Sequence, residues 1–391
     1  MTNGGREIVV VSPYRGEYGP RQVLEHVCLA VIEAGYQPVL AVPSQATITP
    51  LLEKLSAGIH TIDGLRTFPR TFNVLRLASF YRDHRRAARL IEQLARERRA
   101  VGIYSISEAI LAASIAARRI PVPSVVHAIG MSIQSPAWGA QVYIRLLDVL
   151  STRIVACSSA VADMFTSFGV ADEKCTVVHN GISCDDVRAS AHLTAPIDHD
   201  GPRVGMVAAF DPRKGHELFL QAAALIVSRF PKTRFFLLGG ALHAHAESLA
   251  FERRVHLLIA ELGLAEHVEF VGYLPPPNIY AWMRAMDVIV VPSRTEAFAH
   301  ALLEAMVCEK AIVATRIEGN LDAFADGHSG VYTRRNPRDM ASAVCDLLAD
   351  PAKRARMGTA AADRVARYFD LSVTVPANAW VIEQVFRPRA G

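Results

Sequence analysis

The sequence of 391 residues contains no apolar run of about eighteen residues or more, the length that a membrane-spanning helix requires. The apolar stretch near its N-terminus is short and is soon interrupted by Pro13, Arg15 and Glu17, so we expect no signal peptide and a cytoplasmic location. The six cysteines are scattered and form no CxxC pair, which suits a reducing compartment and argues against a zinc site. We therefore predict neither a metal nor a bound cofactor.

Charge of one sign is only mildly in excess. Lysine and arginine outnumber aspartate and glutamate in residues 1–182, whereas the two nearly balance in residues 183–391. This asymmetry points to an anionic ligand in the first half and is too weak to predict a nucleic-acid partner. The strongest basic run, residues 81–100, has apolar residues at helical spacing. It predicts either an ordinary surface helix or a basic amphipathic helix at the inner face of a membrane, and both interpretations stay open.

What the sequence has in abundance is alternation between short apolar strands and helical patterns. Continuous apolar strands flanked by helices are typical of parallel sheets that are covered on both faces. We expect such strands at residues 7–12, 38–43, 101–106, 124–129 and 153–159, and again at residues 203–210, 234–240, 268–273, 287–293 and 311–316. The sequence therefore predicts an α/β protein with two doubly wound, Rossmann-like domains that face each other across a cleft.

A change in composition predicts the domain boundaries. Residues 183–202 are polar, contain prolines and show no periodicity, which indicates a linker. It would separate an N-terminal domain over residues 1–182 from a C-terminal domain over residues 203–370. Residues 371–391 would form a final helix, with the N-terminal domain as its expected packing partner. In doubly wound sheets ligands bind outside the carboxyl ends of the strands, so functional residues are expected just after strands.

The stretch AFDPRKGHELFLQAAALI places two cations where they are electrostatically unfavourable. Arg213 and Lys214 precede a helix, and the N-terminus of a helix already carries partial positive charge. A bound anion would remove this conflict, because N–H groups and cations together grip phosphate oxygens. An ordinary solvated basic loop is the alternative interpretation.

A second stretch, SRTEAFAHALLEAM, puts two carboxylates around the start of an apolar helix. Glu296 lies just before the expected helix start and Glu304 lies on its second turn, about 12 Å further along at about 1.5 Å per residue. Small residues and the first free N–H groups, between Ala299 and Leu302, would let a ligand approach the backbone. The spacing suits a ligand with hydroxyl groups at both ends and a diphosphate between them. For Glu304 alone, an exposed helix position is the alternative.

Together these stretches resemble the retaining glycosyltransferases of family 4, also called group 1, which have the GT-B fold. SRTEAFAHALLEAM resembles their E-x7-E motif, FDPRKGHELFLQA resembles their donor-phosphate segment, and VVHNGI at 177–182 resembles their inter-domain turn. The stretches VEFVGYLPPPN and DGHSGVY follow in the family's order. The resemblance covers most of residues 175–368 and is weaker over residues 1–174.

The resemblance implies a role for each of these residues. Glu304 would hold the ribose hydroxyls of a nucleotide-sugar, and Glu296 would contact the transferred sugar. Arg213 and Lys214 would neutralise the diphosphate. The remaining donor-binding positions would offer backbone N–H groups or close approach, and they are Gly239, Gly240, Gly272, Ala299, His300, Ala301 and Leu302.

The first domain has weaker signals. RGEYG follows the first strand, and Gly16 and Gly19 would allow a phosphate or an acceptor to approach, although such a stretch alone is more often a turn. His127 ends a strand in VVHAIG and matches the family's histidine that contacts the donor sugar, to which domain closure would bring it. The sequence departs from the family near the sugar pocket, with Ala299 in place of a frequent glycine and EGN at 318–320 in place of the usual glycine pair.

The resemblance implies a metal-independent, retaining transfer of a hexose-type sugar from a UDP- or GDP-linked donor to a hydroxyl acceptor on a glycan, a glycolipid or a small molecule. Transfer would be a front-face displacement in which Arg213 and Lys214 stabilise the leaving diphosphate. Two alternatives on the same fold stay open. One is a sugar-nucleotide epimerase, which needs no acceptor, and the other is a non-catalytic sugar-nucleotide-binding protein.

Overall fold

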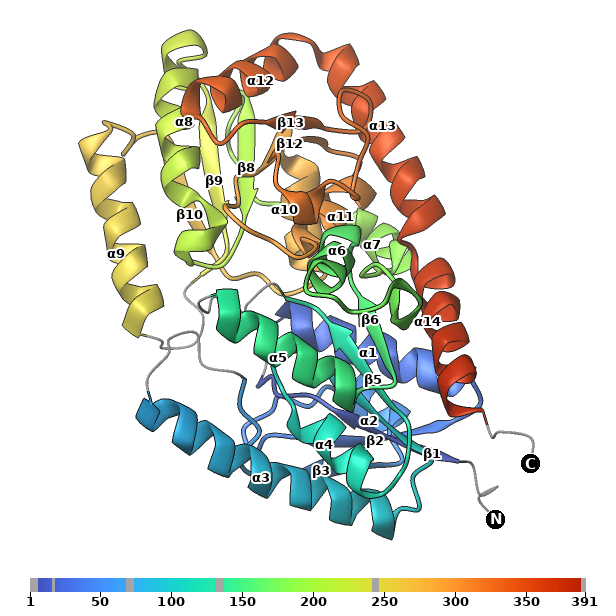
Figure 1. The fold of residues 1–391 in the computed structure, drawn as a ribbon. Coiled ribbons are helices and arrows are strands. Elements are labelled where there is room, and N and C mark those ends of the chain that lie inside the picture. Colours follow the sequence, from blue (N-terminus) through green and yellow to red (C-terminus); the bar gives the residue numbers. More distant parts are fainter. Residues whose placement is uncertain (1–5, 16–17, 68–73, 131–136, 241–245, 388–391) are drawn as a thin grey trace. The chain divides into compact units, whose positions relative to one another are not determined.

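A computed structural model describes residues 6–15, 18–67, 74–130, 137–240 and 246–387 (Figure 1). The chain divides into two compact units. One comprises residues 1–181 together with 371–391, and the other comprises residues 182–370. Each unit is built on one sheet in which all described strand pairs are parallel, so the predicted doubly wound α/β class is confirmed.

The sheet of the first unit has the strand order β3-β2-β1-β4-β5-β6-β7. Its strands are β1 (Glu7–Val11), β2 (Gln37–Val42), β3 (Gly58–Thr61), β4 (Gly102–Ile106), β5 (Ser124–Ala128), β6 (Arg153–Ala156) and β7 (Cys175–Val177). The helices of this unit are α1 (Tyr18–Glu33), α2 (Pro50–Leu55), α3 (Val74–Glu97), α4 (Ala112–Arg119), α5 (Ala137–Leu150), α6 (Ser159–Ser167) and α14 (Leu371–Phe386).

Strand β1 shows why this sheet needs cover on both faces. Ile8 and Val10 belong to one apolar cluster, and Val9 and Val11 belong to another. Because successive side chains of a strand point to opposite faces, a run of four buried aliphatic residues must be covered from both sides. The first cluster includes residues of α1 and α14, and the second includes residues of α3 and α4.

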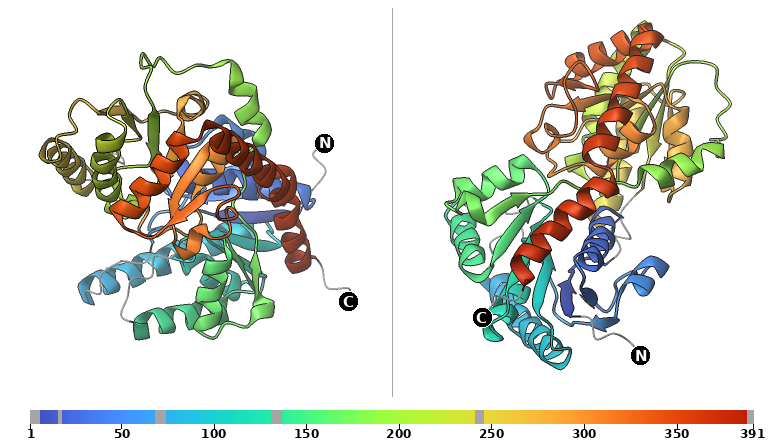
Figure 2. Two further views of the ribbon diagram at one scale, coloured as in Figure 1. Left: turned by 90° about the horizontal axis from the view of Figure 1, so that it is seen from above. Right: turned by 90° about the vertical axis from the view of Figure 1, so that its right-hand side faces the viewer.

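The last helix, α14, is part of the first unit although it follows the second unit in the sequence. It packs against α1 (Figure 2). Val375, Ile382 and Phe386 are buried in the same cluster as Ile8 and Val10. The C-terminal helix therefore completes one side of the first sheet.

Helix α3 contains most of the basic run at residues 81–100. Its apolar side chains, including Ala88, Ile91 and Leu94, are buried against the sheet. The side chains of Arg82, Arg85, Arg86, Arg89 and Arg96 are exposed. The apolar stripe that would enter a membrane surface is thus already used in the core of the unit. No helix in the described ranges is both long enough and apolar enough to cross a membrane.

The sheet of the second unit has the order β10-β9-β8-β11-β12-β13. Its strands are β8 (Arg203–Val207), β9 (Arg234–Leu238), β10 (Val268–Gly272), β11 (Val288–Val291), β12 (Ala311–Thr315) and β13 (Val331–Thr333). Its helices are α7 (Cys184–Ala189), α8 (His216–Arg229), α9 (Ala246–Glu261), α10 (Asn278–Ala285), α11 (His300–Val307), α12 (Pro337–Ala349) and α13 (Pro351–Tyr368).

The segment that we predicted to be a linker, 183–202, is partly ordered into helix. It contains α7 and a following 3-10 turn, and it groups with the second unit. The side chain of Ser183 caps α7 by accepting from the N–H of Asp186, and the guanidinium of Arg284 donates to the carbonyls of Val187 and Ser190. Because this helix has only six residues, it shows no helical periodicity from which the sequence could have predicted it.

Candidate functional site

The loops that follow β8 and β11 meet at the carboxyl edge of the second sheet. These strands are neighbours, and the chain leads from β8 to β9 on one side and from β11 to β12 on the other. Such a reversal of strand order marks the place where doubly wound sheets bind ligands. The N–H of Arg294 donates to the carbonyl of Arg213 at 2.7 Å and joins the two loops. The two stretches singled out from the sequence are therefore brought together here.

An ion pair lies at the centre of this edge. Nζ of Lys214 lies 2.6 Å from Oε1 of Glu296, and the hydroxyl of Ser293 donates to the same carboxylate oxygen at 2.8 Å. The Lys214 side chain is 31% exposed and that of Glu296 is 12% exposed. The pair can therefore be reached by a ligand while most of the Glu296 side chain is shielded from water.

Arg213 is held by a carboxylate that the sequence analysis did not consider. Its Nε and Nη2 donate to both oxygens of Asp211, with the shortest contact at 2.6 Å. Burial alone would raise the pKa of Asp211, but hydrogen bonds from Arg213 and the nearby positive charges hold it below its ordinary value. Asp211 also caps the 3-10 turn at residues 212–214 by accepting from the Arg213 N–H. Asp directly before Pro212 is a helix-start signal that could have identified it.

The electrostatic conflict predicted for the two cations is thus relieved by the protein itself. Each cation faces one carboxylate, Asp211 for Arg213 and Glu296 for Lys214. The two carboxylates stand where we expected a bound anion. Of the interactions formed by the described residues, those of Arg213 use Nε and Nη2, so that Nη1 can take a ligand oxygen.

Helix α11 begins at His300, with Ala299 as its N-cap residue. The start agrees with the expected one, but the N–H of Leu302 already donates to the carbonyl of Ala299 at 3.1 Å. Leu302 therefore does not supply one of the free N–H groups expected for phosphate. Burial, together with the charge of Lys214, lowers the pKa of His300 to about 4, which keeps its ring neutral at the helix N-terminus.

Glu304 is buried, with 4% of its surface exposed. Its neighbours Leu302, Leu303, Ala305 and Met306 are also buried, so α11 is enclosed on all sides. The alternative that Glu304 is an exposed helix residue is therefore wrong. Its role as a ligand of ribose hydroxyls stays a prediction.

The backbone around Glu296 is fixed by close packing against the loop after β12. A side chain at Gly319 would place its Cβ 1.9 Å from the carbonyl oxygen of Glu296 and 2.8 Å from that of Ala297. Only glycine fits at this distance. The EGN stretch at 318–320, which departs from the family's glycine pair, thus keeps the glycine that this contact requires.

The predicted glycine positions lie where β9 and β10 end. Gly239 has a φ of +149°, and its Cβ would lie 1.9 Å from the carbonyl oxygen of Ala208. Its N–H donates to the carbonyl of Gly272 at 2.9 Å, and the carbonyl of Gly240 accepts from the N–H of Phe210. These glycines therefore join the loops after β8, β9 and β10 at one edge of the sheet. Their contact with a donor remains a prediction.

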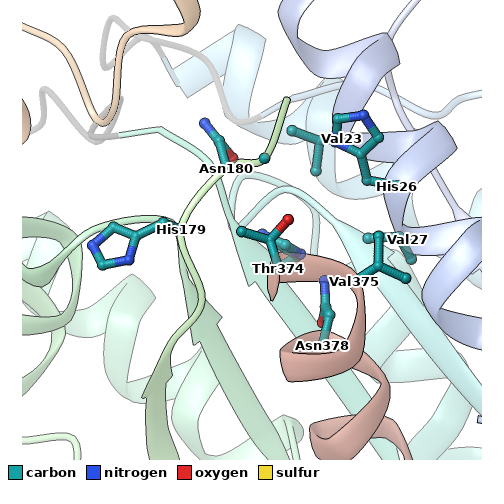
Figure 3. A pocket seen from close by; sticks show the side chains of 10 residues that line it. Val23, His26, Val27, His179, Asn180, Thr374, Val375 and Asn378 are labelled. Carbon is teal, nitrogen blue, oxygen red and sulfur yellow. The ribbon is translucent and has the colours of Figure 1, made fainter. Parts of the chain in front are cut away.

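His127 belongs to the first unit, where it lies near the end of β5 and is 3% exposed. Burial, with a smaller effect of His26, lowers its pKa to about 3, so the ring is neutral. It lines a pocket whose other walls come from α1, α14 and the turn at 179–181 (Figure 3). Of the predicted glycines of this unit, Gly19 lies in the first turn of α1, and Gly16 lies outside the described residues.

No group of three or more His, Cys, Asp or Glu side chains that could hold a metal ion occurs among the described residues. The polar groups at this edge are two cations, the three carboxylates of Asp211, Glu296 and Glu304, and the N-terminus of α11. Such a set can bind a phosphate-bearing ligand with hydroxyl groups nearby, because cations contact phosphate oxygens and carboxylates accept from hydroxyls.

Two protein-family models match this chain in succession. The model described as Glycosyltransferase Family 4 matches residues 19–186, and the one described as Glycosyl transferases group 1 matches residues 191–364. Among curated relatives, D-inositol 3-phosphate glycosyltransferase 2 of Catenulispora acidiphila is 30% identical over 241 residues, which are 60% of this chain and 56% of the relative. D-inositol 3-phosphate glycosyltransferase of Stackebrandtia nassauensis is 31% identical over 230 residues, 56% and 51% of the two chains. The chain spans about half the length of the curated relatives it matches.

Solved structures share the whole fold. Anabaena Alr3699/HepE in complex with UDP is 22% identical with a TM-score of 0.76, covering 97% of this chain and 100% of that chain. The same protein in complex with UDP-glucose is 21% identical with a TM-score of 0.75, covering 97% and 99%. A glycosyltransferase from Rickettsia africae is 18% identical with a TM-score of 0.78, covering 98% and 100%. At these identities the likeness concerns the fold alone, and it confirms the predicted GT-B fold.

Proposed function

Because this chain belongs to family 4 of the glycosyltransferases, we propose that it transfers a hexose-type sugar from a nucleotide diphosphate-sugar to a hydroxyl acceptor. The transfer retains the configuration of the anomeric carbon and needs no metal. The proposal combines the family with the residues at the carboxyl edge of the second sheet.

The Lys214–Glu296 contact of 2.6 Å is the observation that carries the proposal. In a nucleotide-sugar the sugar and the diphosphate share one oxygen atom, so a group that binds hydroxyls must lie beside a group that binds phosphate. Glu296 accepts hydrogen bonds from hydroxyls, and Lys214 neutralises phosphate. Their contact supports a site in which both act on one ligand.

The reaction needs little from the protein beyond positioning and charge. The bond between the anomeric carbon and the phosphate oxygen breaks, and a bond from the acceptor oxygen forms on the same face of the sugar. The acceptor proton passes to the leaving phosphate oxygen. Arg213 and Lys214 stabilise the negative charge on that leaving group, and Glu296 orients the sugar. Glu304, buried within α11, binds the ribose hydroxyls.

The choice of substrates to test follows from the similar proteins. Alr3699/HepE has been solved with UDP and with UDP-glucose, which makes UDP-sugars the first donors to test, with GDP-sugars next. The curated relatives are D-inositol 3-phosphate glycosyltransferases, so inositol 3-phosphate is the first acceptor to test. Glycans, glycolipids and other small-molecule hydroxyls complete the acceptor panel.

A donor panel tests the proposal. Thermal shift and release of nucleotide diphosphate are measured with UDP-, GDP-, ADP- and dTDP-sugars in the presence of a chelator. Stabilisation by one base together with release of its diphosphate supports the transferase. Stabilisation without release, with every acceptor offered, indicates a binding protein. Conversion of the donor sugar without an acceptor indicates an epimerase.

Peripheral contact with an anionic membrane through residues 81–100 is a secondary proposal. The apolar side chains of this segment are buried in the first unit, so the attraction would come from its exposed arginines alone. Sedimentation with vesicles of phosphatidylglycerol at low salt tests it. Binding that vanishes after Arg82, Arg85 and Arg86 are changed to glutamine supports it, and absence of binding by the wild-type protein excludes it.

A further inference from the structure

Three buried polar side chains form a hydrogen-bonded chain inside the first unit. The hydroxyl of Tyr104 on β4 donates to Oδ1 of Asn378 on α14 at 2.9 Å. The same hydroxyl lies 3.0 Å from Nδ1 of His127 on β5. None of the three side chains is more than 5% exposed. Residues from two neighbouring strands and from the last helix of the protein are therefore linked through one phenol oxygen.

The proton positions in this row of hydrogen bonds determine which nitrogen of the His127 imidazole is protonated. A phenol has one proton, and in this chain it points to the amide oxygen of Asn378. The phenol oxygen must then accept from His127, so Nδ1 carries the ring proton. The neutral ring has only one N–H, and Nε2 is consequently left as an acceptor with a lone pair.

Nε2 of His127 has no hydrogen-bond partner among the described residues, although it is shielded from solvent. The ring is among the residues that line one pocket, together with three valines and with polar side chains that carry no carboxylate, ammonium or guanidinium group. Figure 3 shows eight of the other lining residues, namely Val23, His26, Val27, His179, Asn180, Thr374, Val375 and Asn378. Because no carboxylate lines this pocket, a cationic donor would lose its hydration there without gaining an opposite charge, and the acceptor is better suited to a neutral donor. A hydroxyl group is the neutral donor that a sugar substrate carries.

We propose that Tyr104 and Asn378 are positioning residues that fix the tautomer of His127, so that its Nε2 accepts a hydrogen bond from a hydroxyl of the sugar substrate. This inference rests on the proposed function for the identity of the ligand. Neither positioning residue touches the substrate itself. Asn378 determines which group donates and which accepts in each of these hydrogen bonds. Rotating its amide by half a turn would present an N–H to the phenol and would reverse every donor and acceptor.

The tautomer can be read directly by nuclear magnetic resonance. The protein is labelled with ¹⁵N in histidine, and His127→Gln identifies the signals of this ring. The expected result for the wild-type protein is a protonated Nδ1 and an unprotonated Nε2. A protonated Nε2 would overturn the proposal, and this measurement requires no substrate. It therefore stays decisive even if no donor of the panel is turned over, the result that would remove the proposed function.

Variants separate the positioning role from packing. Asn378→Asp keeps an acceptor for the phenol and is expected to keep the tautomer, whereas Tyr104→Phe and Asn378→Leu are expected to lose the single tautomer. Tyr143→Phe is the matched control, because Tyr143 is another buried tyrosine of this unit and its hydroxyl donates to the carbonyl of Glu108. An unchanged His127 spectrum in Tyr104→Phe would contradict the proposal.

Activity provides an independent arm with UDP-glucose and its monodeoxy analogues. Removing the hydroxyl that contacts His127 is expected to lower kcat/KM of the wild-type protein about tenfold, the effect of one hydrogen bond. In Tyr104→Phe, kcat/KM for the same analogue should differ little from that for UDP-glucose. In the control Tyr143→Phe, the two values should differ as much as in the wild-type protein. Equal discrimination by Tyr104→Phe would overturn the role of the tautomer, provided the variant remains folded by circular dichroism.

Discussion

Lys214 and Glu296 lie 82 residues apart in the sequence, and their charged groups are 2.6 Å apart in the structure. The pair joins the loop after β8 to the loop after β11. It also lies in the proposed donor site. In the proposed donor site, a diphosphate bound to Lys214 would compete with Glu296, and the released carboxylate would become available to sugar hydroxyls. The proposed roles therefore predict that binding and orientation of the donor are coupled.

Replacement of Lys214 by alanine should weaken binding of the nucleotide diphosphate by about tenfold or more, because a hydrogen bond to a charged group contributes about 1.5–3 kcal/mol. Isothermal titration with UDP measures the effect. The control is Lys232→Ala, which removes an exposed lysine of the same unit. Equal affinity of Lys214→Ala and the control would take Lys214 out of the site.

Replacement of Glu296 by alanine should act in the opposite way on binding and on transfer. Transfer should fall by about 100-fold, since the sugar loses its orienting carboxylate. The affinity for the diphosphate should be unchanged or higher, because Lys214 is then free of its partner. Steady-state kinetics and titration with UDP separate the two quantities, with Glu266→Ala as an exposed control. A variant as active as the control would contradict the sugar-contact role.

Replacement of Gly239 by alanine should destabilise the protein strongly, because the new Cβ would overlap the carbonyl oxygen of Ala208. Gly263→Ala is a matched control, since Gly263 also has a positive φ, of 67°, but has no atom within 4 Å of the new Cβ. We expect a loss of about 1–2 kcal/mol for Gly263→Ala and a clearly larger loss for Gly239→Ala. Urea unfolding measures both, and similar losses would show that the loop can move aside.

The free energy of unfolding should decrease as the pH is lowered, because His216 is buried in its neutral form. Its ring stacks on Phe210 with centroids 4.7 Å apart, and burial lowers its pKa from 6.5 to about 4. Between pH 6.5 and 4, His216 is protonated in the unfolded chain and stays neutral in the folded protein. The free energy of unfolding therefore decreases as the pH falls from 6.5 to 4, by about 1.4 kcal/mol per pH unit for this group.

The variant His216→Phe should remove this part of the pH dependence while keeping an aromatic ring beside Phe210. Urea unfolding at several pH values between 7 and 4 compares the slopes of the variant and of the wild-type protein. His328→Gln, at an exposed histidine of the same unit, should leave the slope unchanged. A variant slope equal to that of the wild-type protein would mean that His216 is protonated in the folded state.

The sequence predicted the buried strands better than the short ones at the sheet edges. Strands such as β1 and β11 are continuous apolar runs, whose burial on both faces is visible in the sequence. The edge strand β3, GIHT, and the three-residue β13 carry few apolar side chains, and the first has a half-exposed pattern. Their pairing depends on neighbouring strands, which a local pattern does not contain.

The candidate site was predictable where charge conflicted with helix electrostatics and where a family motif matched. The charge conflict pointed to Arg213 and Lys214, and the family motif pointed to Glu296. The partners of these groups were not predictable in the same way. The helix-start signal before Pro212 could have identified Asp211, but it does not show that both carboxylate oxygens accept from Arg213. The contact of Tyr104 with Asn378 joins residues 274 positions apart. Such a contact arises from the return of α14 to the first unit.

That return also sets the order in which the protein can be completed on the ribosome. Val375, Ile382 and Phe386 are part of the core that contains β1, yet they are translated after the whole segment 182–370. At about 5–20 residues per second, translation of segment 182–370 takes roughly ten to forty seconds, and α14 can dock only after it. The unit that begins first in translation therefore finishes last, and during this interval its sheet exposes the apolar face that α14 will cover.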